Sequence, residues 1–240
     1  MLNKIDLVLK NKNINKNMGS IFAGYLMSII DKDYVEYVHH LQLNPYTSYV
    51  YFDKNENKYI WRLNTLDKLS KEMIIDRISV LNIKDFLLEN QNIKVEVDKI
   101  IRYPEVDYST LYLDETPKNK INFNTPASFK SGGVYQIFPQ VDLILNSVVR
   151  KINKFSKDIK IEEQSVLDSI VNKTAITSYT LRSTKYHLEK VRINSFIGDI
   201  CMKNFSNEEY QKIFYFIMQV MNYSGVGIKT SLGMGGVTVE

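Results

Sequence analysis

The chain is poor in the side chains that form disulfides and bind zinc. Its 240 residues include one cysteine, Cys201, and three histidines. A single thiol excludes a disulfide within the chain, and so few cysteine and histidine ligands argue against a zinc site. The sequence therefore predicts no metal and no other cofactor.

Long apolar runs are also missing. No segment has the roughly 20 consecutive apolar residues of a membrane-spanning helix, and no secretory signal is recognisable. With 44% hydrophobic and 24% charged residues, the composition is that of a globular protein. We expect a cytoplasmic protein without a membrane partner, long enough for one large or two small domains.

Positive charge is unevenly distributed. Residues 1–117 carry 15 Lys and Arg against 17 Asp and Glu, whereas residues 118–240 carry 16 against 10. The second half therefore has a net charge of +6, which suits binding to a polyanion such as RNA. The same excess is also common on an ordinary soluble surface.

Glycine is scarce until the end of the chain, where five of the ten glycines fall in the last sixteen residues. Such a loop can turn with positive φ and direct backbone amides at phosphate. It is not a P-loop, because Ile228 precedes Lys229, and a dinucleotide fingerprint would need the reverse order of strand and helix. The alternative is a glycine-rich tail packed against a helix. The candidate RNA-binding residues of this loop are Gly225, Gly227, Lys229, Thr230, Ser231, Gly233 and Gly235.

Hydrophobic periodicity gives the first half the order strand, helix, strand, strand, helix, strand. A short extra helix is expected from Asp31 to about Val38. The expected strands are 2–10, 47–52, 59–63 and 93–101, and the expected helices are 18–29 and 67–88. The first strand, 2–10, should be half-buried.

The second half repeats this order. Ser206 and Glu209 have capping-box spacing, which predicts the start of its last helix. Residues 156–172 have no clear assignment. The expected segments are 120–129, 134–138, 141–152, 175–188, 191–202, the helix after Ser206, and 233–240.

Two βαββαβ units predict an α+β protein made of two tandem ferredoxin-like domains, 1–117 and 118–240. The polar stretch 114–119 is the expected linker.

His39, His40 and Tyr25 are the candidate catalytic residues. An imidazole exchanges a proton near neutral pH, so one histidine could act as general acid or base. Adjacent residues on a helix point about 100° apart, so the pair cannot grip a metal together. The alternatives are a capping or surface histidine and a core tyrosine.

The predicted hairpin of residues 175–202 mixes basic side chains with Tyr186. This pattern suits phosphate contacts with base stacking, although a solvated hairpin face is equally compatible with it. Its candidate RNA-binding residues are Arg182, Lys185, Lys190 and Arg192.

No Ser-His-Asp or Cys-His arrangement is visible. Histidine, tyrosine and lysine together favour RNA transesterification, in which a 2′-hydroxyl attacks its own phosphate with acid–base assistance.

Three segments resemble the CRISPR-associated repeat-processing endoribonucleases, the sixth Cas family of the repeat-associated (RAMP) superfamily. They are the Gly225–Gly235 loop, the His39-His40 segment with the following Asn44-Pro-Tyr-Thr-Ser, and the segment 59–67. The resemblance spans nearly the whole chain.

The resemblance implies metal-independent cleavage of precursor CRISPR RNA within its repeats, leaving 2′,3′-cyclic phosphate and 5′-hydroxyl ends. It implies roles for His39, or His40 if the segment slips by one, and for Tyr25. The family lysine is absent, because Asn44 precedes Pro45.

Two other functions stay open: a non-catalytic RNA-binding subunit of a CRISPR effector complex, and a nucleotide-binding regulator. The expected partner is CRISPR repeat RNA, and the sequence leaves open a homodimer and a transient association with an effector complex.

Overall fold

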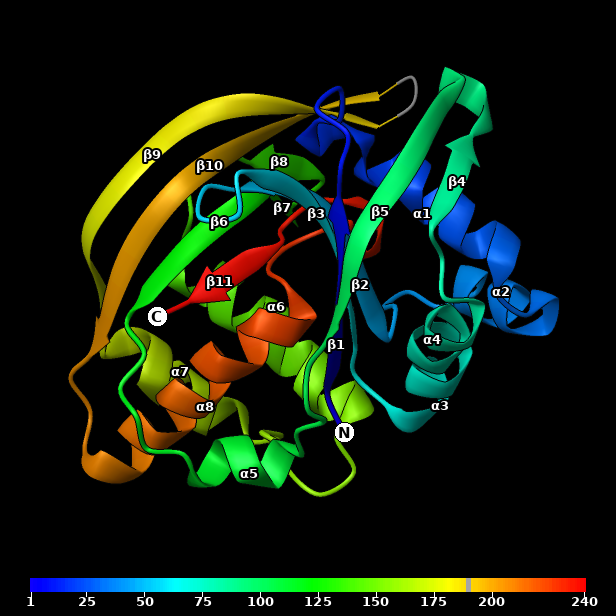
Figure 1. The fold of residues 1–240 in the computed structure, drawn as a ribbon. Coiled ribbons are helices and arrows are strands. Elements are labelled where there is room, and N and C mark those ends of the chain that lie inside the picture. The colour runs from blue at the N-terminus through cyan, green and yellow to red at the C-terminus, as the bar shows by residue number, and fades with distance from the viewer. Residues whose placement is uncertain (189–190) are drawn as a thin grey trace.

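The computed structural model describes residues 1–188 and 191–240 and forms two large antiparallel sheets, each with helices on one face, and a small two-stranded sheet (Figure 1). Strands of the first sheet lie between residues 3 and 102, and strands of the second between 120 and 239. The expected α+β fold is confirmed. In the described residues, no helix is long and apolar enough to cross a membrane.

The first sheet has the strand order β2-β3-β1-β5-β4, with every neighbouring pair antiparallel. Without β4, this is the ferredoxin-like order expected from the sequence. Its strands are β1 (Asn3–Leu9), β2 (Tyr46–Asp53), β3 (Lys58–Thr65), β4 (Asp85–Leu88) and β5 (Ile93–Arg102). Its helical segments are η1 (Lys16–Met18), α1 (Gly19–Ile29), α2 (Lys32–His39), α3 (Lys68–Ser70), η2 (Lys71–Asp76), α4 (Arg77–Leu81) and η3 (Glu89–Gln91).

The second sheet repeats this plan in the order β11-β6-β10-β9. A small hairpin, β7 with β8, follows β6. The strands are β6 (Lys120–Ala127), β7 (Phe129–Ser131), β8 (Val134–Gln136), β9 (Thr174–Leu188), β10 (Val191–Asn204) and β11 (Val237–Val239). The helices are α5 (Tyr108–Leu113), α6 (Val141–Phe155), α7 (Gln164–Asn172), α8 (Glu208–Ser224) and η4 (Thr230–Leu232).

Two expectations for the first half are corrected. The helix expected over 67–88 ends at Leu81, because Asn82 takes the left-handed conformation with φ 44°. The chain then forms β4, which buries Phe86 and Leu88. Strand β1 is buried on both faces rather than one. Leu7 and Leu9 join the core with Phe22 on one face, and Val8 packs with Tyr49 and Tyr51 on the other.

The second half also differs in detail. The cap of α8 is Asn207, whose side chain accepts a hydrogen bond from the Tyr210 amide at 3.1 Å, so the Ser206 assignment was one residue early. The segment that the sequence left unassigned contains α7, whose buried Leu167 and Ile170 join the core.

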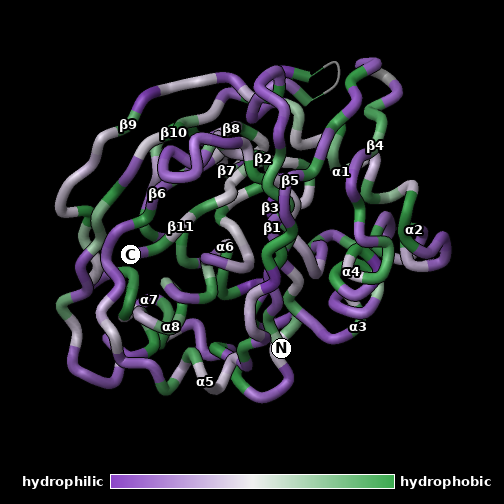
Figure 2. Tube along the Cα trace, viewed as in Figure 1, coloured by the Kyte–Doolittle hydropathy of each residue, from purple (hydrophilic) through white to green (hydrophobic). Residues whose placement is uncertain are grey.

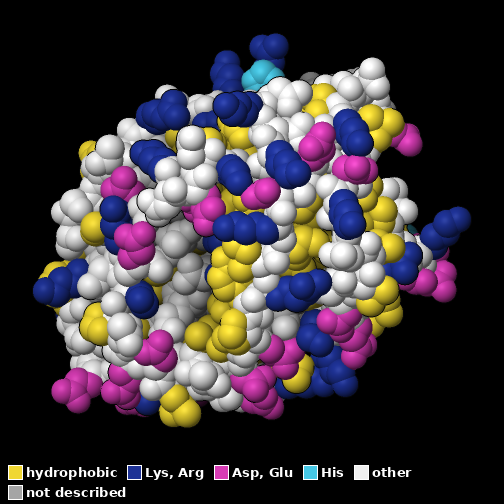
Figure 3. All heavy atoms as spheres, viewed as in Figure 1, with side chains coloured by type: hydrophobic (Ala, Val, Ile, Leu, Met, Phe, Trp, Pro, Cys, Tyr) yellow, Lys and Arg dark blue, Asp and Glu magenta, His cyan; other side chains and the backbone are white. Residues whose placement is uncertain are grey.

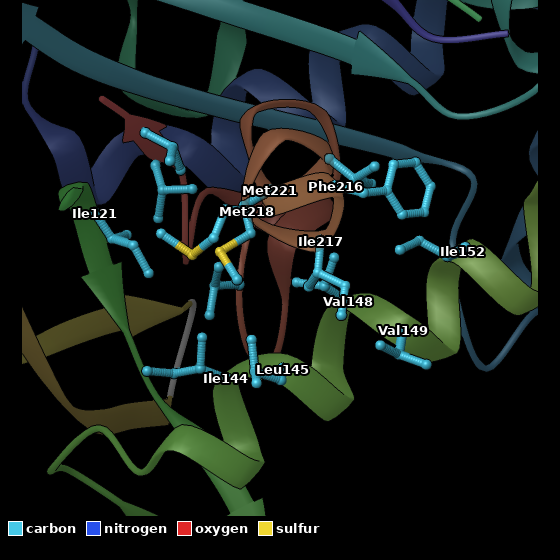
Figure 4. Packing of buried hydrophobic residues seen from close by; sticks show 14 of the residues in the cluster. Ile121, Ile144, Leu145, Val148, Val149, Ile152, Phe216, Ile217, Met218 and Met221 are labelled. Atoms are coloured by element: carbon cyan, nitrogen blue, oxygen red, sulfur yellow. The ribbon is translucent and has the colours of Figure 1, made fainter. Parts of the chain in front are cut away.

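Each half has a large cluster of buried hydrophobic residues, and that of the second half also includes Leu2 and Leu66 of the first. In the second, α6 and α8 face each other, as Figure 4 shows for Ile144, Val148 and Ile217. In the first, α1 packs on the sheet through Phe22, whose ring meets Trp61 edge-on at 5.2 Å. Figure 2 shows hydrophobic residues concentrated in the inner strands and hydrophilic ones in the outer loops.

The two halves contact each other through β2 and the end of the chain. The Thr47 hydroxyl donates to the Tyr223 carbonyl at 3.1 Å, and Gly236 lies against the Tyr49 ring, so closely that a Cβ would stand 2.5 Å from it. These contacts fix β2 of one half against α8 and the glycine-rich loop of the other.

Candidate active site

A cleft of about 910 Å³ opens where the two halves meet. One wall is the face of α1 and the segment that follows α2, and the other is α6, the glycine-rich loop and the end of the β9–β10 hairpin. The lining residues include Ser20, Ala23, Gly24, Met27, Val38, His39, Leu41, Gln42, Leu43, Asn44, Tyr46, Lys130, Leu143, Asn146, Ser147, Arg150, Lys151, Leu188, Val191, and Gly227 to Leu232.

The charge lining this cleft has one sign. Its ionisable side chains, apart from Tyr46, are His39, Lys130, Arg150, Lys151 and Lys229, and no Asp or Glu of the described residues lines it. A concave surface lined by cations attracts anions and raises their local concentration. The cleft is therefore suited to a polyanion such as an RNA strand.

His39 is placed at the cleft by the short helix α2. Asp31 caps this helix by accepting a hydrogen bond from the Tyr34 amide at 3.0 Å, and His39 is its last residue. Both histidines are exposed, but only His39 lines the cleft. This geometry favours His39 over His40 as the catalytic residue.

Tyr25 lies elsewhere on α1. Its ring stacks on Phe86 at a centroid distance of 4.1 Å, whereas the cleft is lined by Gly24 and Met27 of the same helix. Burial, with a smaller effect from Asp85, raises the pKa of its phenol. The structure thus gives Tyr25 a packing role, and its participation in catalysis stays a prediction.

The glycines of the loop serve close backbone packing. A Cβ on Gly227 would stand 2.4 Å from the Ser128 carbonyl oxygen, and one on Gly235 would stand 1.9 Å from the Val226 carbonyl oxygen. Gly225 has φ 61° as it leaves α8. Close packing of a glycine-rich tail, the alternative to RNA binding in the sequence analysis, therefore accounts for these glycines.

Only the middle of the loop, Gly227 to Leu232, borders the cleft. Within it, Lys229 is exposed, while Thr230 and Ser231 are 7% and 6% exposed. Lys229 itself takes a left-handed conformation, φ 56°. Gly227 and Lys229 are therefore the most accessible of the loop residues expected to contact RNA. Gly225, Gly233 and Gly235 are buried and are the least accessible.

Side chains from both halves hold this loop. The Asn44 amide donates to the Ser231 hydroxyl at 2.9 Å, so Asn44 links the two halves. Burial raises the pKa of the neighbouring Tyr46 to about 12, an effect that its hydrogen bond with Ser231 opposes. On the other side, Lys151 donates to the Thr230 hydroxyl at 2.8 Å.

The β9–β10 hairpin was predicted correctly, and its described basic residues Arg182, Lys185 and Arg192 are exposed. Lys190 lies outside the described residues. Figure 3 shows Lys and Arg side chains around the end of this hairpin, whereas acidic side chains gather near α5 and α3. The expectation that Tyr186 stacks on a base is wrong, because it is fully buried and donates to the Leu232 carbonyl at 2.6 Å.

Sequence reasoning missed the cations Lys130, Arg150 and Lys151. The apolar residues of α6 predict one buried face, and a second face of the same helix borders the cleft. Asn146, Ser147 and Arg150 follow Leu143 at helical spacing and line the cleft. That spacing could have identified Arg150 as a residue of the cleft. Lys151 lies within the apolar stripe of α6, and its spacing does not indicate a place in the cleft.

Two tandem ferredoxin-like sheets, with a glycine-rich loop beside a cationic cleft, form the architecture of a repeat-associated RAMP protein. A family profile described as CRISPR-associated endoribonuclease Cas6 matches residues 121–237. A CRISPR-associated endoribonuclease Cas6 of Streptococcus thermophilus is 30% identical over 224 residues, which cover 91% of this chain and 90% of the relative. The chain belongs to the Cas6 family of CRISPR-associated endoribonucleases.

More distant relatives agree with this assignment. A Mycobacterium tuberculosis Cas6 is 22% identical over 241 residues, covering 99% of this chain and 76% of its own. A Cas6 product complex superposes with a TM-score of 0.83 at 22% identity over 100% of this chain and 99% of the other. For a Thermus thermophilus Cas6 the TM-score is 0.72 at 17% identity, covering 100% and 98%. The family and the fold predicted from the sequence are confirmed.

Proposed function

We propose that this endoribonuclease cleaves precursor CRISPR RNA within its repeats, in the cleft between the two halves, and so generates guide RNAs. The observation that carries the proposal is the position of His39 in a cleft whose other charged side chains, among the described residues, are all cations. A proton-exchanging group beside bound phosphate is what RNA transesterification needs.

The chemistry follows from this arrangement. A base removes the proton of the 2′-hydroxyl, whose oxygen attacks the adjacent phosphorus, and an acid protonates the leaving 5′-oxygen. The products are a 2′,3′-cyclic phosphate and a 5′-hydroxyl, without water or a metal as a reactant. His39 supplies one of the two proton transfers, and Arg150 and Lys229 stabilise the charge on the phosphate. They are the candidates to replace the family lysine, which is absent near Pro45, where Asn44 precedes the proline.

The RNA strand extends from this centre in two directions. The loop from Gly227 to Ser231 contacts its backbone, and the exposed hairpin residues Arg182, Lys185 and Arg192, together with Lys190, contact flanking phosphates. Tyr25 does not line the cleft, and cleavage by Tyr25→Phe tests whether its hydroxyl takes part in the reaction. We place this activity in the cytoplasm, where the RNA precursor is made.

The test is cleavage of labelled repeat RNA in the presence of a chelator. We expect one cut per repeat, a cyclic phosphate on the 5′ fragment, and no cut when the nucleotide before the scissile bond carries 2′-deoxyribose. A cut in the deoxy substrate, or cleavage that the chelator abolishes, would contradict the mechanism. Tight binding without any cut would point to the non-catalytic subunit instead.

A further inference from the structure

Lys151 carries a buried amine that lines the cleft, and it is not among the site residues predicted from the sequence. It lies on α6 between the core residues Val149 and Ile152, and only 4% of it is exposed. Its Nζ donates to the Thr230 hydroxyl at 2.8 Å and to the Ser224 carbonyl oxygen. None of the ion pairs among the described residues includes it. Burying an ammonium group without a carboxylate partner costs free energy, and hydrogen bonds offset only part of that cost. The burial of Lys151 therefore calls for a structural reason.

The two acceptors flank one short segment. Ser224 is the last residue of α8, and Thr230 is the first residue of η4. The chain between them runs from Gly225 to Lys229 and includes three residues with positive φ. One amine therefore ties together both ends of the segment that brings Lys229 to the cleft.

Other hydrogen bonds hold this segment at single points, among them the one that the Val226 amide donates to the Gly235 carbonyl at 2.9 Å. The Gly227 amide donates to the Ser147 hydroxyl at 3.2 Å, and the Ile228 amide donates to the Ser128 carbonyl at 3.0 Å. Both partners belong to the second half, as Lys151 does. Lys151 is the only one of these groups that bonds to both ends.

We propose that Lys151 is a positioning residue for RNA binding: by joining Ser224 to Thr230, it holds the segment Gly225 to Lys229 in the shape that faces the phosphate backbone. This inference rests on the proposed function. Burial lowers the pKa of the amine to about 7. The role survives that shift, because a neutral amine still has two N–H donors for the two acceptors.

Lys151→Met tests the proposal, with Lys157→Met as the charge-matched control at an exposed position just after α6. Binding is measured with repeat RNA carrying 2′-deoxyribose at the scissile nucleotide, and cleavage is measured in single turnovers. For Lys151→Met we expect half-saturation at protein concentrations about tenfold higher or more, together with a lower cleavage rate at saturation, because displacing the segment also displaces Lys229 from the phosphate. Lys157→Met should match wild type in both.

Thr230→Val completes a double-mutant cycle, because it removes the hydroxyl acceptor while keeping the shape of the side chain. If the Lys151–Thr230 bond positions the loop, the double variant loses no more RNA affinity than Lys151→Met alone. Losses that multiply, or unchanged affinity in a folded Lys151→Met protein, would overturn the proposal. If Lys151→Met does not fold, unchanged affinity in Thr230→Val would overturn it equally. Wild-type protein that fails to bind repeat RNA contradicts the proposed function, and is measured first.

Discussion

Gly19 and Gly233 face each other across the junction of the two halves, and neither position has room for a side chain. A Cβ on Gly19 would stand 2.4 Å from the Cα of Gly233, and a Cβ on Gly233 would stand 2.7 Å from the Cα of Gly19. Gly19 is the first residue of α1, and Gly233 follows η4. The pair therefore sets the spacing between the helix and the loop that form opposite walls of the cleft.

Replacing Gly233 by alanine should destabilise the protein by about 2 kcal/mol or more. The residue has φ 98°, and a Cβ there would also stand 2.2 Å from the Tyr186 hydroxyl. Urea unfolding measures the change. Gly24→Ala is the control: nothing lies within 4 Å of its Cβ, and alanine in a helix gains about 0.5–1 kcal/mol over glycine. Equal stability of Gly233→Ala and wild type would mean that α1 and the loop are not in contact.

His39→Ala should lower the cleavage rate of repeat RNA by about 10² to 10⁴-fold, the usual contribution of a general acid or base. RNA binding should persist, because Arg150, Lys130 and Lys229 remain in the cleft. The measurement is single-turnover cleavage at saturating protein, with binding followed by filter retention.

His40→Ala is the matched control for this experiment, since His40 is also exposed but does not line the cleft. It should cleave at nearly the wild-type rate. Loss of cleavage in His40→Ala with full activity in His39→Ala would reverse the assignment, and full activity in the double variant would rule out a histidine mechanism.

Local patterns were enough to place most of the fold. Alternating residues predicted β5, and helical spacing predicted α1 and α6, because these signals come from burial of one face. The errors arose where a single residue decides the conformation. Asn82 ends α4 with φ 44°, a conformation that asparagine adopts more readily than most residues. The apolar residues on both sides of it, Leu81 and Ile83, continue the helical pattern and so hide this signal.

The site was harder to predict, because it is formed by contacts between residues far apart in sequence. Lys151 looked like one charge inside an apolar stripe, and its acceptors lie 73 and 79 residues away. Tyr186 looked like an exposed strand aromatic, but it is covered by the loop around Leu232, 46 residues later. Spacing along one strand or helix contains no information about such partners.

Lys229→Met should weaken binding of the deoxy repeat RNA several-fold at moderate salt. Lys229 is exposed and lines the cleft, so it can neutralise one phosphate. The slope of log affinity against log salt concentration should fall in magnitude by about 0.7 to 1, which corresponds to one lost phosphate contact. A salt titration from low to moderate ionic strength measures both effects. If the slope of Lys229→Met equals that of wild type, Lys229 makes no phosphate contact.

Stability should depend on pH through Lys151. Burial lowers the pKa of its amine from 10.5 to about 7 in the folded protein, so between these values the unfolded chain binds the proton that the folded chain has lost. The free energy of unfolding should therefore rise with pH across this window, by up to about 1.4 kcal/mol per pH unit from this one group. Lys4, whose pKa burial lowers to about 8, adds a change of the same sign above pH 8. Urea unfolding of wild type and Lys151→Met at pH 7, 8 and 9 separates the two, because the variant keeps only the Lys4 contribution. Parallel curves for the two proteins would mean that the amine of Lys151 is charged in the folded state throughout this range.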